Sequence, residues 1–179
     1  MSPTDVPHEG ELHKLMAAQH AILDELLAKA AQPDEIDEDA YRCFRERLLR
    51  HIRIEEKILL PMAERKRGTP LSIAARLRLD HGALAALLMV PPSAKTFHAI
   101  RAVLDAHNPL EEVAGGVYDQ CDSLSGAESN VLLARIAATP AVPVSSWVDS
   151  PKVVAAAQRA LSRAGYDPRI LDAAESKSN

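Results

Sequence analysis

Aromatic residues are scarce in this chain and make up only 3% of its 179 residues. No stretch alternates polar and apolar residues with the period of a β-strand. Hydrophobic residues are plentiful, at 47%, and Ala and Leu predominate among them, which favours helices packed on helices. The length predicts one domain with room for a short appendage.

The sequence also lacks the features of a membrane protein, a secreted protein or a nucleic-acid-binding protein. No apolar run approaches the roughly 18 residues that a membrane span requires. The first residues, "MSPTDVPHEGEL", contain neither the basic nor the apolar region of a secretory signal. The net charge of −4 gives no indication of a polyanion such as nucleic acid. We therefore expect neither a membrane nor a nucleic-acid partner.

Cysteine is also rare. Cys43 and Cys121 form no CxxC pair, and two thiols are too few for a disulfide framework. A reduced, cytoplasmic setting is the simplest expectation.

The spacing of apolar residues predicts four long helices. Residues 11–31 form the first, and the acidic segment "QPDEIDED" ends it and starts the second, which runs to about Arg67. Thr69 and Pro70 suit the cap and first position of a third helix that ends near residue 90. The fourth runs from Ser93 to about Leu124, with an interruption expected at Asn108–Pro109 and an end at Gly126.

These elements predict an all-α fold in which residues 1–125 form an antiparallel, up-down-up-down four-helix bundle. Residues 126–179 are expected to add a helical extension packed on the bundle. Within this extension, a short helix at 127–138 precedes the Pro-rich linker "TPAVPVSSWVDSP". Ser150 and Pro151 would begin a last helix that ends near Gly165.

Two short motifs occur twice. "HIRIEE" at 51 resembles "HNPLEE" at 107, and each places a histidine four residues before a glutamate on one helix face. "HAILDELL" at 20 likewise matches "HGALAALL" at 81. Each half of the sequence is therefore a helix carrying one histidine, followed by a helix carrying a His-x-x-x-Glu pair.

Antiparallel packing brings these motifs to one level. Residues opposite each other in a hairpin have numbers that sum to twice the loop midpoint, and the three loops centre near residues 35, 68 and 93. The first midpoint sets His51 opposite His20, and the second sets Glu55 opposite His81. By the same arithmetic the cluster gathers four histidines and two glutamates: His20, His51, Glu55, His81, His107 and Glu111.

Taken singly, these motifs have simpler explanations. A lone histidine on an apolar face is usually a core residue with a hydrogen-bond partner, and a His-x-x-x-Glu pair is usually a surface contact. Six converging groups are different, because buried carboxylates and imidazoles are costly unless a metal compensates them. Imidazole and carboxylate without thiolate suit iron or manganese better than structural zinc. If both glutamates bridge two ions, about two coordination positions per ion stay open for chemistry or sensing.

The pattern of His20, His51-x-x-x-Glu55, His81 and His107-x-x-x-Glu111 resembles the hemerythrin-like (HHE cation-binding) family. The resemblance covers roughly residues 10–125. It implies a four-helix bundle around two oxo- or hydroxo-bridged irons, with the six residues as ligands and both glutamates bridging. Manganese or zinc could substitute for iron.

The sequence also differs from oxygen-carrying hemerythrin. That protein has a further histidine four residues before the one on its third helix, where this chain has Leu77. Its last carboxylate is an aspartate one position later. The present pattern is closer to bacterial hemerythrin-like proteins linked to peroxide or nitric oxide, although Pro109 inside the last motif is unusual.

Several nearby polar residues are set apart from the cluster. We expect His13 to line one end of the bundle and His98 to lie on the surface. Asp24 could orient an imidazole, but a solvated face is the simpler interpretation. Tyr118 is interpreted as a core residue, with gating or electron relay as the alternative.

The two acids that directly follow the cluster glutamates, Glu56 and Glu112, should point away from the centre. Trp147 is expected to anchor the linker on the bundle.

Three functions remain open. The first is a diiron enzyme that decomposes hydrogen peroxide or reacts with nitric oxide. The second is a protein that reversibly binds or senses dioxygen, nitric oxide or iron. The third is a structural bundle that binds metal adventitiously. In each the partner is a small molecule, and the chain could be a monomer or a homodimer.

Overall fold

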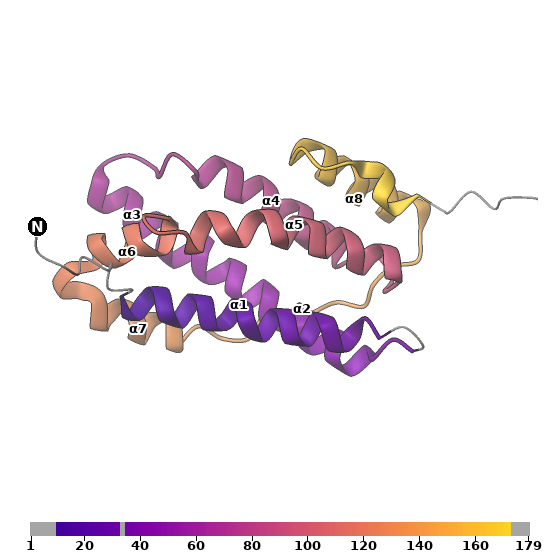
Figure 1. Ribbon diagram of the computed structural model, residues 1–179, viewed down its shortest axis with the longest axis horizontal. Helices are drawn as coiled ribbons and strands as arrows, with labels where there is room; N and C mark the ends of the chain where they lie inside the picture. Colours follow the sequence, from indigo (N-terminus) through magenta and orange to yellow (C-terminus); the bar gives the residue numbers. More distant parts are fainter. Residues whose placement is uncertain (1–9, 33–34, 173–179) are drawn as a thin grey trace, which may run out of the picture.

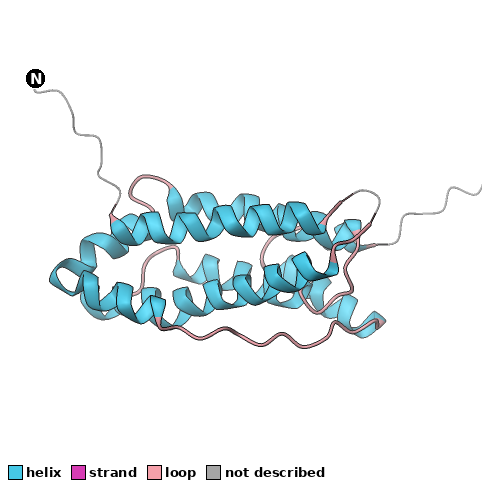
Figure 2. Ribbon diagram, turned by 90° about the horizontal axis from the view of Figure 1, so that it is seen from below, coloured by secondary structure: helices cyan, strands magenta, loops and turns pink. Residues whose placement is uncertain are grey.

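The computed structural model describes residues 10–32 and 35–172, and all regular structure in these ranges is helical (Figure 2). The all-α prediction is confirmed for this part of the chain. The eight α-helices are α1 (Glu11–Ala30), α2 (Glu38–Ile54), α3 (Leu60–Arg67), α4 (Ala74–Leu87), α5 (Ala94–Glu112), α6 (Val117–Ser125), α7 (Ser129–Ala137) and α8 (Pro151–Arg163). The other helical segments are a π-helix, η1 (Glu55–Leu59), and two 3₁₀ segments, η2 (Gly126–Glu128) and η3 (Pro168–Leu171).

Helices α1, α2, α4 and α5 run along the long axis of the molecule (Figure 1). Helices α6 and α7 lie near one end, and α8 lies against α4 nearer the other. The run from α2 through η1 to α3 is continuous, so the predicted second helix does extend to Arg67. None of the helices in the described residues is long and apolar enough to cross a membrane.

Side-chain caps fix the starts of α2, α5 and α8. Asp37 accepts a hydrogen bond from the Ala40 amide at 2.8 Å, and Ser93 accepts one from Thr96 at 3.1 Å. Ser150 caps α8 with Pro151 as the first helical residue, as its sequence predicts. The N-terminus of α1 lacks such a cap, and the carboxylate of Asp122 on α6 accepts its free amides instead.

The predicted start of the third helix is wrong. Gly68 ends α3 in the left-handed region, with φ of 78°, and α4 begins only at Ala74. Thr69 and Pro70 are exposed, whereas Leu71 is buried in the core. The chain uses a turn to bring Leu71 inward before the helix can start.

The interruption expected at Asn108–Pro109 is also misplaced. Helix α5 continues through Pro109 to Glu112, and the break falls between Val113 and Gly116. Pro109 and Asp105, whose carbonyl loses its helical donor to the proline, are both exposed, so water can solvate that carbonyl. The break restarts the chain as α6, which ends at Gly126 as predicted.

The core consists of two apolar clusters. One lies around Leu23, Phe44 and Leu84 and includes Leu161 of α8. The other lies around Met16, Ile54 and Leu77 and includes residues of α6 and α7. Buried histidines separate members of the two clusters along the chain: His20 lies between Met16 and Leu23, and His81 between Leu77 and Leu84. A polar layer therefore divides the hydrophobic core.

The linker from 138 to 150 is extended and follows the outside of the helices (Figure 2). Trp147 lies with its ring centroid 6.2 Å from that of Tyr41, and the Arg45 guanidinium lies 5.6 Å from its ring. Arg45 also donates to the Ser145 carbonyl at 2.7 Å. The prediction that Trp147 anchors the linker is confirmed.

Gly116 is the glycine on which the turn after α5 depends. A Cβ atom there would lie 2.6 Å from the Val113 carbonyl oxygen and 2.7 Å from that of Glu111. We expect Gly116→Ala to lower the free energy of unfolding by about 1–3 kcal/mol, because the backbone must move to remove the clash.

Gly82→Ala is the matched control, measured by the same denaturant titration. Gly82 is an exposed residue of α4 with no atom within 4 Å of an added Cβ, so alanine should stabilise by about 1 kcal/mol. Equal stability of Gly116→Ala and the wild type would contradict the role of the close approach.

Candidate metal centre

Five helical segments, two of them continuous with each other, carry the six residues of the predicted cluster. His20 lies on α1, His51 on α2 with Glu55 directly after it in η1, His81 on α4, and His107 with Glu111 on α5. All six side chains are buried, with at most 4% of their surface exposed. The structure brings all six together.

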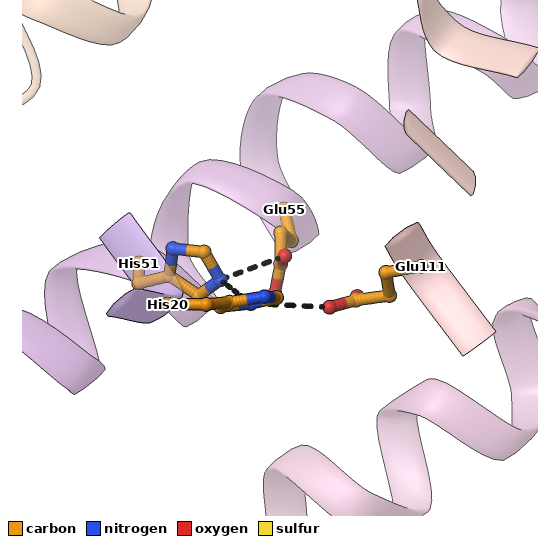
Figure 3. Close-up of side chains that lie close together, drawn as sticks. All are labelled: His20, His51, Glu55 and Glu111. Atoms are coloured by element: carbon orange, nitrogen blue, oxygen red, sulfur yellow. Dashed lines mark hydrogen bonds and ion pairs between the residues drawn. The ribbon is translucent and has the colours of Figure 1, made fainter. Parts of the chain in front are cut away.

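They form two groups of four that overlap. The first group is His20, His51, Glu55 and Glu111, and the second is Glu55, His81, His107 and Glu111. Within each group, one ligand atom per residue lies within 4.8 Å of every other. Either group could hold a metal ion, and both glutamates belong to both groups. Figure 3 shows the first, with side chains from three separate segments converging.

The four histidines form two pairs, His20 with His51 and His81 with His107, and Glu55 lies between the pairs. Its Oε1 is 3.0 Å from His51 Nε2, and its Oε2 is 3.1 Å from His81 Nε2. Glu111 lies similarly, with Oε2 3.5 Å from His20 Nε2 and 3.3 Å from His107 Nε2. Each carboxylate therefore faces one histidine of each pair, which is the placement of a bridging ligand.

Tyr118 lies at the centre of the first group, and the sequence interpretation missed this role. Its hydroxyl donates to Glu55 at 2.7 Å or Glu111 at 3.0 Å, and it lies 3.1 Å from His20 Nε2. The side chain is fully buried. Tyr118 is thus a site residue as well as a core residue. The seven-residue spacing from Glu111 predicted that Tyr118 lies on the same helix face as Glu111. The break between α5 and α6 is what brings the Tyr118 hydroxyl to the centre.

The outer nitrogen of each histidine has an oxygen partner. Carboxylate and amide oxygens can only accept, so each Nδ1 carries a proton, and each Nε2 faces the centre from the other side of the ring. The partners are Glu112 for His20, Gln19 for His51 at 3.1 Å, Glu56 for His81 at 2.7 Å and Asp80 for His107 at 3.4 Å.

Metal-binding histidines in proteins are held in this way. Glu56 and Glu112 point away from the centre, as expected, but each orients a histidine of the other hairpin, which was not expected. Gln19 and Asp80 were also missed. The available signal was position, because each of the four directly precedes or follows a cluster residue in the sequence.

The π-helix begins at Glu55 itself. The Leu60 amide donates to the Glu55 carbonyl, five residues back, and Pro61 follows within the first turn of α3. A π turn relieves the clash between a proline ring and the preceding turn, and such turns are frequent at functional sites. Glu55 and the apolar run Ile58–Leu60 are all buried as a result. Pro61 was the sequence signal for this irregularity.

Electrostatics differ between the two histidine pairs in the metal-free protein. Burial, reinforced by His51, lowers the pKa of His20 to about 3, so its contacts with Glu111 and Glu112 involve a neutral imidazole. Burial also disfavours protonation of His81 and His107. Contacts with Glu55 and Glu56 outweigh it for His81 and raise its pKa to about 9. Asp80 and Glu111 do the same for His107, whose pKa rises to about 10.

The two glutamates also differ. Burial opposes ionisation of Glu55, but His51 and His81 hold its pKa well below the usual value. Burial and the charge of Glu55 raise the pKa of Glu111.

The unpaired atoms at the centre fit a metal. Glu111 Oε1 is buried without a hydrogen-bond partner among the described residues, and Glu55 Oε2 and His81 Nε2 have only their 3.1 Å ionic contact with each other. His20 Nε2 and His51 Nε2 lie 2.8 Å apart, and both nitrogens face the centre. Two nitrogens on adjacent positions of an octahedral ion would lie about 3 Å apart for bonds of about 2.1 Å. A cation at each group would therefore satisfy atoms that the protein leaves unpaired.

The other polar residues near the cluster lie outside it. His13 is buried beside the centre, with Nδ1 2.6 Å from Asp119 Oδ1 and its ring edge-on to Tyr118. His98 is exposed, as predicted. Asp24 pairs with Arg101 and orients no imidazole of the cluster.

Comparison with known proteins gives no relative. No protein-family model matches the chain, and neither a curated protein nor a solved structure matches it significantly. The resemblance to hemerythrin-like proteins therefore rests on the residue pattern, and the function must be argued from the site.

Metal content provides the first test of the site. Single changes to alanine at His20, His51, His81 or His107 should each weaken binding of at least one ion, because each removes an inward nitrogen donor. Metal per chain is measured by elemental analysis after loading and gel filtration. His98→Ala is the matched control and should keep the wild-type content. Full metal in both His20→Ala and His81→Ala would refute the cluster as the binding site.

A second test uses pH. Between pH 7 and 9 the metal-free protein keeps protons on His81 and His107 that unfolding releases, because the ordinary histidine pKa is 6.5. The folded state binds more protons, so the free energy of unfolding should fall as pH rises through this window. Metal-loaded protein should lack this dependence, since the ions have displaced the protons. Urea titrations at pH 7 and pH 9 measure it, and an unchanged midpoint for the metal-free protein would contradict it.

Proposed function

We propose that this chain is a non-haem diiron protein of the hemerythrin-like type that decomposes hydrogen peroxide. In this proposal α1, α2 with α3, α4, and α5 with α6 correspond to the four helices of an antiparallel bundle around two ions. The observation that supports it best is the pair of overlapping four-residue groups, which share Glu55 and Glu111 and leave buried atoms of both unpaired.

The donor set divides naturally into two positions. His20 and His51 would hold one ion, and His81 and His107 the other. Glu55 would contribute Oε1 to the first position and Oε2 to the second, as its two short contacts suggest. Glu111 would bridge from the opposite side. Two nitrogens and two oxygens for each ion, with no sulfur, suit iron or manganese and leave about two positions open on an octahedral ion.

Iron at these positions would supply one-electron redox change and Lewis acidity. Peroxide decomposition needs no electron donor, since two molecules of hydrogen peroxide give two of water and one of dioxygen. One peroxide is reduced while the other is oxidised. This balance fits a site buried among apolar side chains, which excludes bulky reductants but admits a small neutral molecule.

Tyr118 would act as a hydrogen-bond donor at the centre. Burial raises the pKa of its phenol well above the ordinary value, and Glu55 and Glu111 raise it further, so the hydroxyl stays protonated. It can therefore fix the orientation of either glutamate and offer a proton to an oxygen atom that approaches between them. The outer partners Glu56 and Glu112 keep their imidazoles turned inward throughout.

Oxygen evolution tests the proposal. Iron-loaded protein should release dioxygen from hydrogen peroxide, followed with an oxygen electrode, at a rate well above that of an equal concentration of free ferric iron. Glu55→Ala should lose the activity, because it removes a ligand of both positions. His98→Ala is the matched control and should keep it.

The contrary result would identify the second candidate. A wild-type rate no higher than that of free iron would reject the peroxide reaction. Reversible spectral changes with dioxygen or nitric oxide, without turnover, would then support a binding or sensing protein. Nitric oxide meets the same criteria of small size and neutral charge.

A further inference from the structure

We infer that the two metal positions are unequal: the His81/His107 position binds its ion more tightly, and the His20/His51 position exchanges its ion and admits small molecules. This inference rests on the proposed function and concerns the residues behind the histidines. Its basis is one difference between the two repeated hairpins: Gln19 contacts a histidine in the first, and Asp80 contacts the equivalent histidine in the second. The C-terminal extension fixes the position of Asp80 through Arg76.

The repeat extends to the outer partners. Glu56 follows Glu55 and orients His81, and Glu112 follows Glu111 and orients His20. His20 and His81 occupy equivalent positions in the two hairpins, so the residues that directly precede them are also equivalent. Gln19 precedes His20 and contacts His51, whereas Asp80 precedes His81 and contacts His107.

The equivalent residues differ in charge. Gln19 offers a neutral amide oxygen to His51, and Asp80 offers a carboxylate to His107. A carboxylate behind a metal-binding imidazole makes its inner nitrogen a stronger donor than an amide does. Both histidines of the second pair have carboxylate partners, but only one histidine of the first pair has. The second position should therefore hold a cation more tightly.

Asp80 is held in place from outside. Its side chain is fully buried, and Arg76 Nε donates to its Oδ2 at 3.1 Å. Arg76 also donates to the Tyr166 hydroxyl at 3.0 Å and lies 5.3 Å from the centre of that ring. Tyr166 lies three residues after the end of α8, which packs against α4. The C-terminal extension thus covers Asp80 and Arg76, which hold His107 in place.

The other half of the centre is more open. Gln19 is only partly buried and lines a surface pocket of about 310 Å³ together with Leu23, Arg47 and Arg50. Its amide contacts His51 from this pocket. Glu112, the partner of His20, lines a second surface depression beside Pro109. Both outer partners of the His20/His51 pair therefore border hollows in the surface, whereas Asp80 lies under Arg76 and Tyr166.

The test is a calorimetric titration of the metal-free, full-length chain with Fe(II) under argon. The wild type should show two binding steps whose affinities differ by at least about tenfold. His107→Ala should remove the tighter step and His51→Ala the weaker one.

Exchange variants then test the cause. Asp80→Asn keeps the shape of the side chain and should weaken the tighter step by about 10–100-fold, with little change in the weaker step. Gln19→Glu should strengthen the weaker step and bring the two affinities together. Asp24→Asn, at a surface carboxylate paired with Arg101, is the matched control and should change neither step.

The contribution of the extension is measured separately. Tyr166→Phe keeps the ring but removes the hydroxyl that Arg76 contacts, so a chelator should remove the tightly held ion faster than from the wild type. Circular dichroism confirms that each variant is folded.

The outcomes separate the two claims. Two ions of equal affinity in the wild type, or loss of the weaker step in His107→Ala, would overturn the inequality and leave the proposed function standing. Equal effects of Asp80→Asn and Gln19→Glu on both steps would overturn the stated cause. Failure of the wild type to bind two ions would overturn the proposed function itself, and this inference with it.

Discussion

The structure depends on two carboxylates buried in the interior. Glu55 and Glu111 lie in the polar layer between two apolar clusters, where Glu111 Oε1 has no hydrogen-bond partner among the described residues and Glu55 Oε2 contacts only His81. Burying such groups costs several kcal/mol unless positive charge compensates them. In the metal-free protein, protonated His81 and His107 provide that compensation. Metal ions would provide it more completely, because a cation can contact the unpaired oxygens and imidazole nitrogens at once. The buried donors therefore could hold metal ions.

The repeated hairpin explains how so short a sequence builds this layer. A cluster residue and its neighbour in the chain serve opposite hairpins: Glu55 faces the centre while Glu56 orients His81, and Glu111 faces it while Glu112 orients His20. One pair of adjacent residues thus supplies both a ligand and the support for another ligand. This arrangement also couples the two hairpins, since each depends on the other to orient one of its two histidines.

Much of the site followed from the sequence because helical geometry is regular. The spacing of His51 and Glu55, and the loop midpoints, were enough to place six residues at one level. The sequence predictions were wrong or incomplete where the backbone departs from the α-helix. The π turn at Glu55 and the break after Glu112 depend on how Pro61 and Gly116 fit their surroundings, which periodicity does not describe. Tyr118 is in the core as expected, but its contact with the centre was not expected, since that contact requires the break.

The differences between the two repeats are as informative as their similarity. If the hairpins were identical, two bound ions would share one environment, and neither position would be reserved for exchange or for substrate. The first hairpin has the amide of Gln19 where the second has the carboxylate of Asp80. This difference makes the surroundings of the two histidine pairs unequal, although the four histidines and two glutamates that face the centre are the same in kind. Helix α8 and Tyr166 then cover the half that contains Asp80, through Arg76, whereas the linker borders the Gln19 pocket only at Ala141. If the two positions differ as we infer, a segment far from the repeated motifs contributes to that difference by fixing Asp80 through Arg76 and Tyr166.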